Sequence, residues 1–133
     1  MIVQGQQVAE WVRAVVGGIP MHGSLGYGWT EDGILVAGVS LEGFNGGQVI
    51  MHHRYEKSPP KSYWAIGADH IFNVMKAKRI TGLINASNMK SKRLVKHLGA
   101  KHEATLKCAG DNGEDMEVWA CFKEDCLPLK WSK

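Results

Sequence analysis

Apolar residues near the start of the chain recur every three or four positions, the spacing that places them on one face of an α-helix. These residues are Val8, Trp11, Val12, Val15 and Val16. Gly17, Gly18 and Pro20 follow directly and form a strong helix stop signal. We therefore predict an amphipathic helix over residues 6–16, whose apolar face needs a sheet or another helix to cover it.

The pattern then changes to that of β-strands. Residues 24–29, 34–41 and 48–55 are rich in apolar, aromatic and β-branched residues, and turn-forming residues separate them. In the third strand, alternation predicts one face made of Val49, Met51, His53 and Tyr55 and another made of Gln48, Ile50, His52 and Arg54. The adjacent histidines His52 and His53 should therefore lie on opposite faces of a sheet.

The second half of the chain alternates between helix and strand. Pro60 suits the first position of a helix whose apolar stripe runs from Trp64 to Met75, and a strand over residues 79–85 follows. This strand–helix–strand succession predicts a right-handed parallel unit. The remaining predicted elements are a helix over residues 89–98 ending at Gly99, and strands over residues 103–108 and 116–122 joined by a hairpin turn at residues 111–113.

The resulting order, α-β-β-β-α-β-α-β-β, predicts an α/β (α+β) protein with a mixed central sheet and one domain over residues 1–133. Apolar residues make up 44% of the chain and charged residues 22%, as in ordinary globular proteins. No apolar run reaches the length of a membrane span, and the first residues do not form a secretory signal, so we expect a cytoplasmic protein. The net charge is +3, and the basic residues gather between residues 57 and 107, where a phosphate-bearing partner would bind.

Residues 79–106 carry a specific family pattern. Asn88, Ser91 and Arg93 open a helix that ends in Leu98-Gly99, and this segment resembles the GNAT N-acetyltransferase superfamily, in particular its ribosomal-protein branch. Residues 8–12, 32–39, 43–46 and 122–126 are also similar to small GNAT-like proteins encoded by phages and prophages. The resemblance implies a single-domain GNAT fold in which two parallel strands, here residues 48–55 and 79–85, splay apart.

The resemblance also implies a reaction. Acetyl-CoA would be the cosubstrate, with pantetheine between the splayed strands and the pyrophosphate at the start of the following helix, where free amides and the helix dipole attract anions. A primary amine would attack the thioester directly, assisted by a base and by an acid that protonates the leaving thiolate.

Candidate catalytic residues are His52, His53 and Ser91. A neutral histidine facing the cleft is a competent base, and the alternation places His52 on the more polar face and His53 on the more apolar one. Each histidine has a purely structural alternative, and Glu56 is a second candidate base. Ser91 is the candidate acid because Val95 stands where many relatives have a tyrosine, although Ser91 could instead cap its helix or face solvent. Neighbours on a strand cannot converge on one ion, so we expect no metal site.

Candidate cofactor-binding residues are Arg54, Lys57, Lys61, Ser62, Tyr63, Asn88 and Ser91. The loop before the second helix departs from the family pattern, because it has no glycine and because Pro59 and Pro60 lack amide donors. Lys57 and Lys61 would supply charge in place of amides, and the amides of Ser62, Tyr63 and Trp64 would remain free. Asn88 is expected to cap the helix that follows it and to contact the cofactor.

The sequence thus predicts an acetyl-CoA-dependent N-acetyltransferase of phage or prophage origin, acting on an amine of a small molecule or a protein. The alternative is a GNAT-like module without catalysis that serves in binding or in a virion. A nucleic-acid-modifying relative is a third reading, which the modest net charge supports only weakly.

Overall fold

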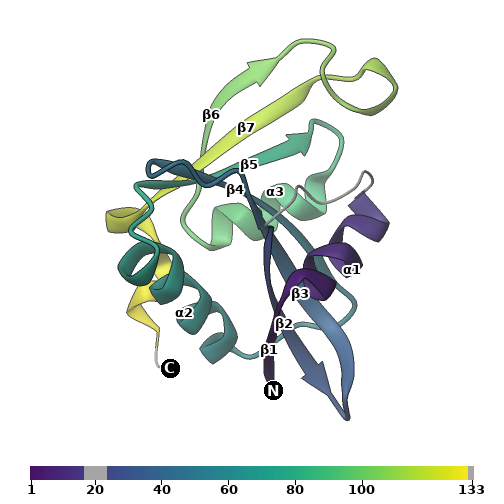
Figure 1. Cartoon of the computed structure of the whole chain (residues 1–133). Helices are drawn as coiled ribbons and strands as arrows, with labels where there is room; N and C mark the ends of the chain where they lie inside the picture. The colour runs from purple at the N-terminus through teal and green to yellow at the C-terminus, as the bar shows by residue number, and fades with distance from the viewer. Residues whose placement is uncertain (17–23, 132–133) are drawn as a thin grey trace.

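The computed structural model describes residues 1–16 and 24–131 (Figure 1). The strands are β1 (Ile2–Gln4), β2 (Leu25–Glu31), β3 (Ile34–Glu42), β4 (Gln48–Tyr55), β5 (Arg79–Asn85), β6 (Lys101–Leu106) and β7 (Met116–Phe122). The α-helices are α1 (Gln6–Val16), α2 (Lys61–Asp69) and α3 (Met89–His97). Short helical turns cover His70–Val74, Asp111–Gly113, Lys123–Asp125 and Leu127–Lys130.

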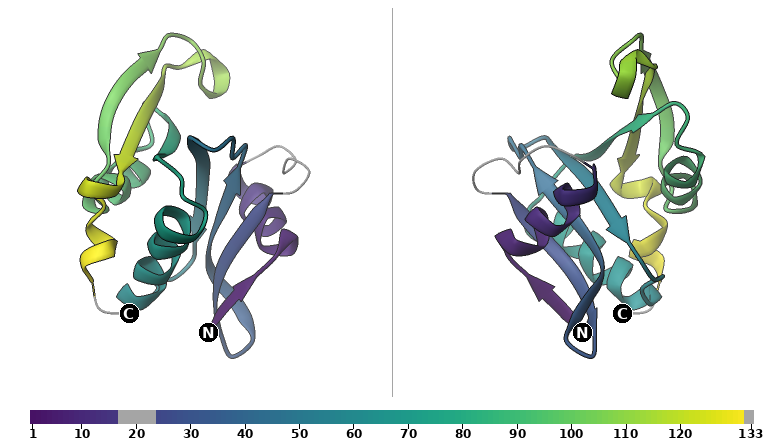
Figure 2. Two further views of the ribbon diagram at one scale, coloured as in Figure 1. Left: turned by 60° about the vertical axis from the view of Figure 1, so that its left-hand side comes forward. Right: turned by 90° about the vertical axis from the view of Figure 1, so that its right-hand side faces the viewer.

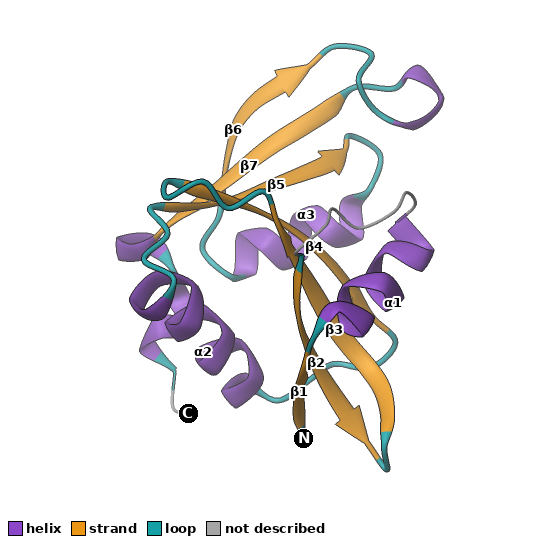
Figure 3. Ribbon diagram, in the orientation of Figure 1, coloured by secondary structure: helices purple, strands orange, loops and turns teal. Residues whose placement is uncertain are grey.

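Within the described ranges, all the strands join one mixed sheet in the order β1-β2-β3-β4-β5-β7-β6. The pairing is antiparallel except between β4 and β5, which run parallel and are connected through α2. Helices lie on both faces of this sheet (Figure 3). This architecture is the mixed α/β fold that the sequence predicts.

Helix α1 covers one face of β2, β3 and β4. Its apolar stripe is fully buried at Val8 and Val12. The helix packs almost directly on the backbone of β2, because a Cβ atom on Gly26 would lie 2.6 Å from the amide nitrogen of Ala9. A glycine at this position therefore sets the close approach of α1 to the sheet.

Helices α2 and α3 supply the hydrophobic core on the opposite face. Tyr63 and Phe72 come from the segment after β4, and Val95 comes from α3. They pack against Val39 and Val49, which point away from α1 because strand residues alternate between faces. The sheet therefore separates an α1 face from an α2/α3 face.

The parallel strands β4 and β5 diverge along their length. They are paired at Gln48–Arg79, Val49–Ile80 and Ile50–Thr81. The pairing stops there, although both strands continue. Figure 2 shows β2–β4 and β5–β7 spreading apart beyond this point. The predicted splay of residues 48–55 and 79–85 is confirmed.

Several details differ from the sequence predictions. Strand β1, with three residues, was not predicted, since so short a segment carries no readable alternation. Strand β6 begins at Lys101 and ends at Leu106, two residues earlier at each end than expected. The predicted hairpin turn at residues 111–113 is a helical turn in which Asn112 adopts the left-handed conformation. The predicted helix stop at residues 17–20 lies outside the described residues.

No helix in the described part of the chain is long and apolar enough to cross a membrane.

Candidate active site

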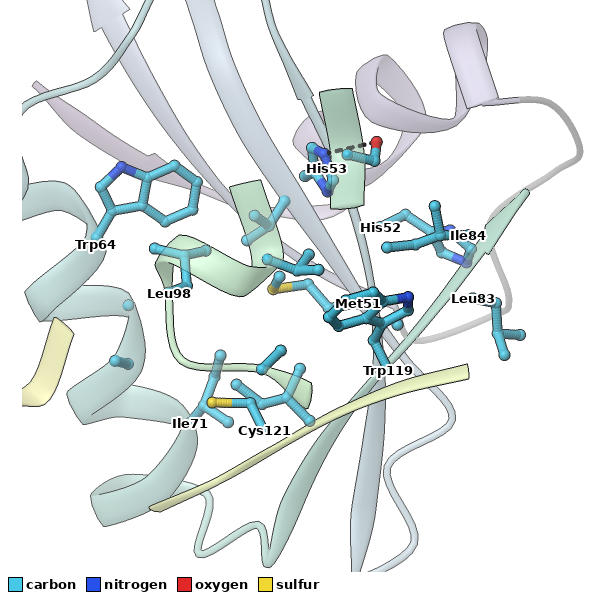
Figure 4. A pocket seen from close by; sticks show the side chains of 18 of the residues that line it. Met51, His52, His53, Trp64, Ile71, Leu83, Ile84, Leu98, Trp119 and Cys121 are labelled. Atoms are coloured by element: carbon cyan, nitrogen blue, oxygen red, sulfur yellow. Dashed lines mark hydrogen bonds between the residues drawn. The ribbon is translucent and has the colours of Figure 1, made fainter. Parts of the chain in front are cut away.

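A cavity of about 500 Å³ occupies the place where β4 and β5 part. Met51 and Ile84 line it from the two splayed strands, Trp64 from α2, Leu98 from the end of α3 and Trp119 from β7 (Figure 4). Residues from both faces of the sheet contribute, since the missing strand pairs leave a passage through it. The cavity is a largely apolar channel with a few polar side chains, the usual character of a small-molecule site.

His53 and Ser91 meet on the α2/α3 face of this cavity. Ser91 Oγ lies 3.2 Å from His53 Nε2, and Figure 4 draws this hydrogen bond as a dashed line. The two residues come from β4 and α3, so the contact bridges the elements that the splay separates. Burial, followed by the nearby charges of His52 and Lys90, lowers the pKa of His53 to about 4, so its ring is neutral at physiological pH.

Asn88 fixes the start of α3 and thereby the position of Ser91. Its side-chain oxygen accepts a hydrogen bond of 3.1 Å from the Ser91 amide, as an N-cap does. The predicted capping role of Asn88 is confirmed. Because the cap uses the Ser91 amide and not its hydroxyl, Ser91 Oγ is left to contact His53 in the cavity.

His52 lies on the opposite face of β4, toward α1, and also lines the cavity. Its Nε2 atom is 3.8 Å from Oε2 of the buried Glu42, and the other Glu42 oxygen lies 3.6 Å from Nε of Arg13. Ser40 Oγ donates a 3.0 Å hydrogen bond to Oε1 of Glu42. Burial and then the charge of Arg13 lower the pKa of His52, while Glu42 acts to raise it.

Two predicted cofactor ligands are engaged elsewhere. The guanidinium of Arg54 stacks on Trp11, 4.0 Å from the ring centre, donates to the Trp11 carbonyl and pairs with Glu56 at 2.7 Å. Arg54 and Glu56 therefore belong to the α1 face and do not line the cavity. Lys57 forms an exposed ion pair of 2.6 Å with Glu31, beside the β2–β3 turn.

The start of α2 offers fewer amides than the sequence suggests. The Tyr63 amide donates to the Pro60 carbonyl at 3.0 Å, so the expectation of a free Tyr63 amide is wrong. The turn that begins at Pro60 closes on itself and uses this donor. The Tyr63 side chain is buried in the cavity wall, and its hydroxyl donates to the Tyr27 carbonyl at 2.8 Å. Lys61 and Ser62 stay at the helix start, with the Lys61 ammonium 5.5 Å from the ring centre of Trp131.

The structure adds site residues that sequence reasoning missed. Arg13 and Trp119 line the cavity, and Glu42 stands behind His52. Arg13 lies outside the apolar stripe of α1, at a position where a surface charge is ordinary, so its sequence context gives no signal. Within residues 1–16 and 24–131, no three His, Cys, Asp or Glu side chains gather as a metal site requires.

Neither a protein-family model nor a curated protein matches this sequence. Solved acetyltransferase structures nevertheless share its fold. A GNAT-family acetyltransferase from Bacillus anthracis has 18% identity and a TM-score of 0.62, over 76% of this chain and 66% of that one. A spermidine N-acetyltransferase from Vibrio cholerae, solved in complex with CoA and spermine, has 13% identity and a TM-score of 0.67, over 80% of this chain and 69% of that one.

A proposed acetyltransferase from T. thermophilus has 19% identity and a TM-score of 0.66. The likeness covers 78% of this chain and 61% of that one, so the chain spans less than two thirds of that relative's length. At these identities the likeness establishes the fold. The chain has the GNAT fold.

Proposed function

We propose that the protein transfers an acetyl group from acetyl-CoA to a primary amine. The observation that carries this proposal is the channel between β4 and β5, in which His53 and Ser91 meet at 3.2 Å on one face while His52 lines the other. A transfer between two substrates needs a passage that both can enter, with proton-handling groups on each side of the reacting atoms.

The residues present fit the pantetheine arm of acetyl-CoA. Beyond Ile50 and Thr81 the facing edges of β4 and β5 no longer pair with one another, so main-chain groups line the passage. Apolar side chains such as Met51, Ile84 and Leu98 suit the aliphatic part of the arm. When bound, acetyl-CoA supplies an activated acetyl group.

The phosphates of acetyl-CoA would be bound by charged side chains more than by backbone amides. Pro59 and Pro60 have no N–H group and the Tyr63 amide is taken, so Lys61, with the amide of Ser62, is the main candidate at the start of α2. Lys90, at the start of α3, is exposed and lies on the same side of the site as Tyr55, with its ammonium 5.0 Å from that ring. This arrangement supports Lys61 over Lys57 and Arg54 as a phosphate ligand.

The two faces would divide the proton transfers. On the α1 face, neutral His52 accepts a proton from the substrate ammonium, and the freed amine forms the new C–N bond. On the other face, the C–S bond breaks and the sulfur takes a proton from Ser91. With its proton on Nε2, His53 donates to Ser91 Oγ, which leaves the hydroxyl proton free to point to the sulfur. As the amide forms, the nitrogen loses its second proton, and this proton replaces, by way of solvent, the one that Ser91 gave to the sulfur.

The proline-containing loop favours a second candidate, a GNAT-like binding module without catalysis. The closed turn at Pro60 and the Lys57–Glu31 ion pair both reduce the groups available for a pyrophosphate. In this case the channel would bind another molecule or remain a structural feature. Phage origin, a cytoplasmic location and a nucleic-acid partner stay predictions from the sequence.

Isothermal titration with acetyl-CoA, with desulfo-CoA as a second ligand, tests the proposal. We expect binding in the micromolar range, lost in Gly82→Phe, because Gly82 lines the channel and an added Cβ would meet nothing nearer than the Trp119 carbonyl oxygen at 4.0 Å. Ala104→Phe on the exposed strand β6 is the matched control and should bind normally. Lys61→Ala should weaken binding more than Lys101→Ala, and equal effects would remove Lys61 from the phosphate site. No binding at millimolar ligand would overturn the proposal in favour of the module.

A further inference from the structure

The α1 face of the channel carries little negative charge. Among the described residues that line the cavity, Asp111 is the one carboxylate, and it is held by Asn85 through hydrogen bonds of 2.9 and 3.0 Å. Glu42 is buried and engaged by Ser40. A polyamine with several ammonium groups would find few anionic partners at this face.

Arg13 places a guanidinium on the same face, where it lines the cavity and forms an ion pair with Glu42. Its Nε atom is buried and has no hydrogen-bond partner among the described residues. Glu42 Oε1 lies 3.6 Å from this atom, beyond hydrogen-bond distance, and already accepts a hydrogen bond from Ser40. A guanidinium next to a cavity is suited to bind a carboxylate through two parallel hydrogen bonds.

Arg13 and His52 line the same end of the channel, and both lie against Glu42. A substrate whose carboxylate pairs with Arg13 would therefore hold a nearby amine close to the His52 ring.

We propose that the acceptor is a small amino carboxylate, an amine with a carboxylate one or a few bonds away, and that Arg13 binds this carboxylate. This inference rests on the proposed acetyl transfer and adds its substrate class. It excludes polyamines such as spermidine as the preferred acceptor. Among the described residues, Arg13 of α1, His52 of β4 and Asp111 line the cavity, and the buried Glu42 of β3 lies behind Arg13 and His52.

Matched pairs of acceptors test the inference, with release of the CoA thiol from acetyl-CoA as the readout. The pairs are leucine with isoamylamine, phenylalanine with phenethylamine, and histidine with histamine, and spermidine is assayed beside them. We expect kcat/KM to be at least about tenfold higher for the carboxylate-bearing member of a pair, since a charge-assisted hydrogen bond contributes that much or more.

The variant Arg13→Gln should lower this ratio to near one, and Arg13→Lys should keep part of it. The matched control is Arg93→Gln, because Arg93 is exposed on α3 and does not line the cavity. Higher kcat/KM for spermidine or for the decarboxylated amines would overturn the inference, and so would an unchanged ratio in Arg13→Gln. If acetyl-CoA binds and no amino carboxylate reacts, the substrate class is wrong. If acetyl-CoA itself does not bind, the proposed function is wrong as well.

Discussion

The two faces of β4 place the same side chain in different surroundings. His53 meets a neutral hydroxyl in a mostly apolar wall, and burial lowers its pKa to about 4. His52, one residue earlier, lies among Arg13, Glu42 and Ser40, where burial and Arg13 lower its pKa and Glu42 opposes that shift. Strand alternation alone separates the two environments.

This difference suggests how one strand can serve two chemical tasks. A histidine with a pKa near 4 is a weak base at neutral pH and is better suited to orient a neighbouring hydroxyl. A histidine next to a carboxylate keeps more basicity and is better suited to accept a proton from an ammonium. Substitutions on each face should therefore affect different steps of the reaction.

The largest effect is expected from His52→Gln. Removing a general base typically lowers a rate by a factor of about 100 or more. We expect a loss of that size in kcat/KM for the amine, measured by release of the CoA thiol, with little change in the Kd for acetyl-CoA. An equally large loss of acetyl-CoA affinity would mean that His52 binds this cosubstrate and is not the base.

His53 should make folding sensitive to acid. Its folded-state pKa of about 4 is below the ordinary 6.5, so the unfolded state binds more protons between these values. Stability is therefore full above pH 6.5 and falls as the pH drops toward 4, by about 3 kcal/mol at most for this group. Urea unfolding at several pH values should show a correspondingly smaller loss in His53→Gln. In His97→Gln, which alters an exposed histidine, the loss should match that of the wild type.

Ser91→Ala should reduce kcat by about tenfold, which is less than the hundredfold or more typical of a catalytic acid, since water can replace the hydroxyl in part. The expected change is in kcat and not in the KM for the amine, because Ser91 lies on the face opposite the acceptor. Steady-state kinetics at saturating acetyl-CoA measures both. A rise in the KM for the amine with an unchanged kcat would show that Ser91 binds the amine and is not the acid.

The smallest effect on kcat/KM is expected from Glu42→Gln. Glutamine keeps the shape of the side chain and can still accept a hydrogen bond from Ser40. Loss of the negative charge lowers the pKa of His52, because Glu42 acts to raise it. The acidic limb of kcat/KM should therefore move to lower pH. A shift to higher pH would show that Glu42 does not support the basicity of His52.

Local patterns predicted much of this site. Alternation places His52 and His53 on opposite faces, and Asn88 caps α3 as predicted. Helical spacing identifies the buried Val8 and Val12 of α1, but the predicted face also included Val15, which is 63% exposed. The surroundings of these residues depend on contacts between distant parts of the chain. Glu42 precedes a turn-forming glycine and has the sequence context of an exposed charge, yet Arg13 and His52 enclose it from α1 and β4.

The start of α2 shows the same limit. The sequence shows that Pro59 and Pro60 lack amide donors. The hydrogen bond from the Tyr63 amide to the Pro60 carbonyl depends on the path of the backbone, which the sequence does not show. Likewise Lys57 was predicted near the phosphates, and its ion pair with Glu31 joins two loops that are far apart in sequence. Sequence patterns thus indicate which residues can act, whereas tertiary contacts decide which are available.

The most direct test of the account is the pH profile of kcat/KM for the amine in the wild type and in His52→Gln. If His52 deprotonates a bound ammonium, the wild-type profile rises through the lowered pKa of His52 and then stays level up to the pKa of the free amine. The variant must use the rare neutral amine, so its profile should rise about tenfold per pH unit over the same range. A level region at the same pH in His52→Gln would contradict the assignment of His52 as the base.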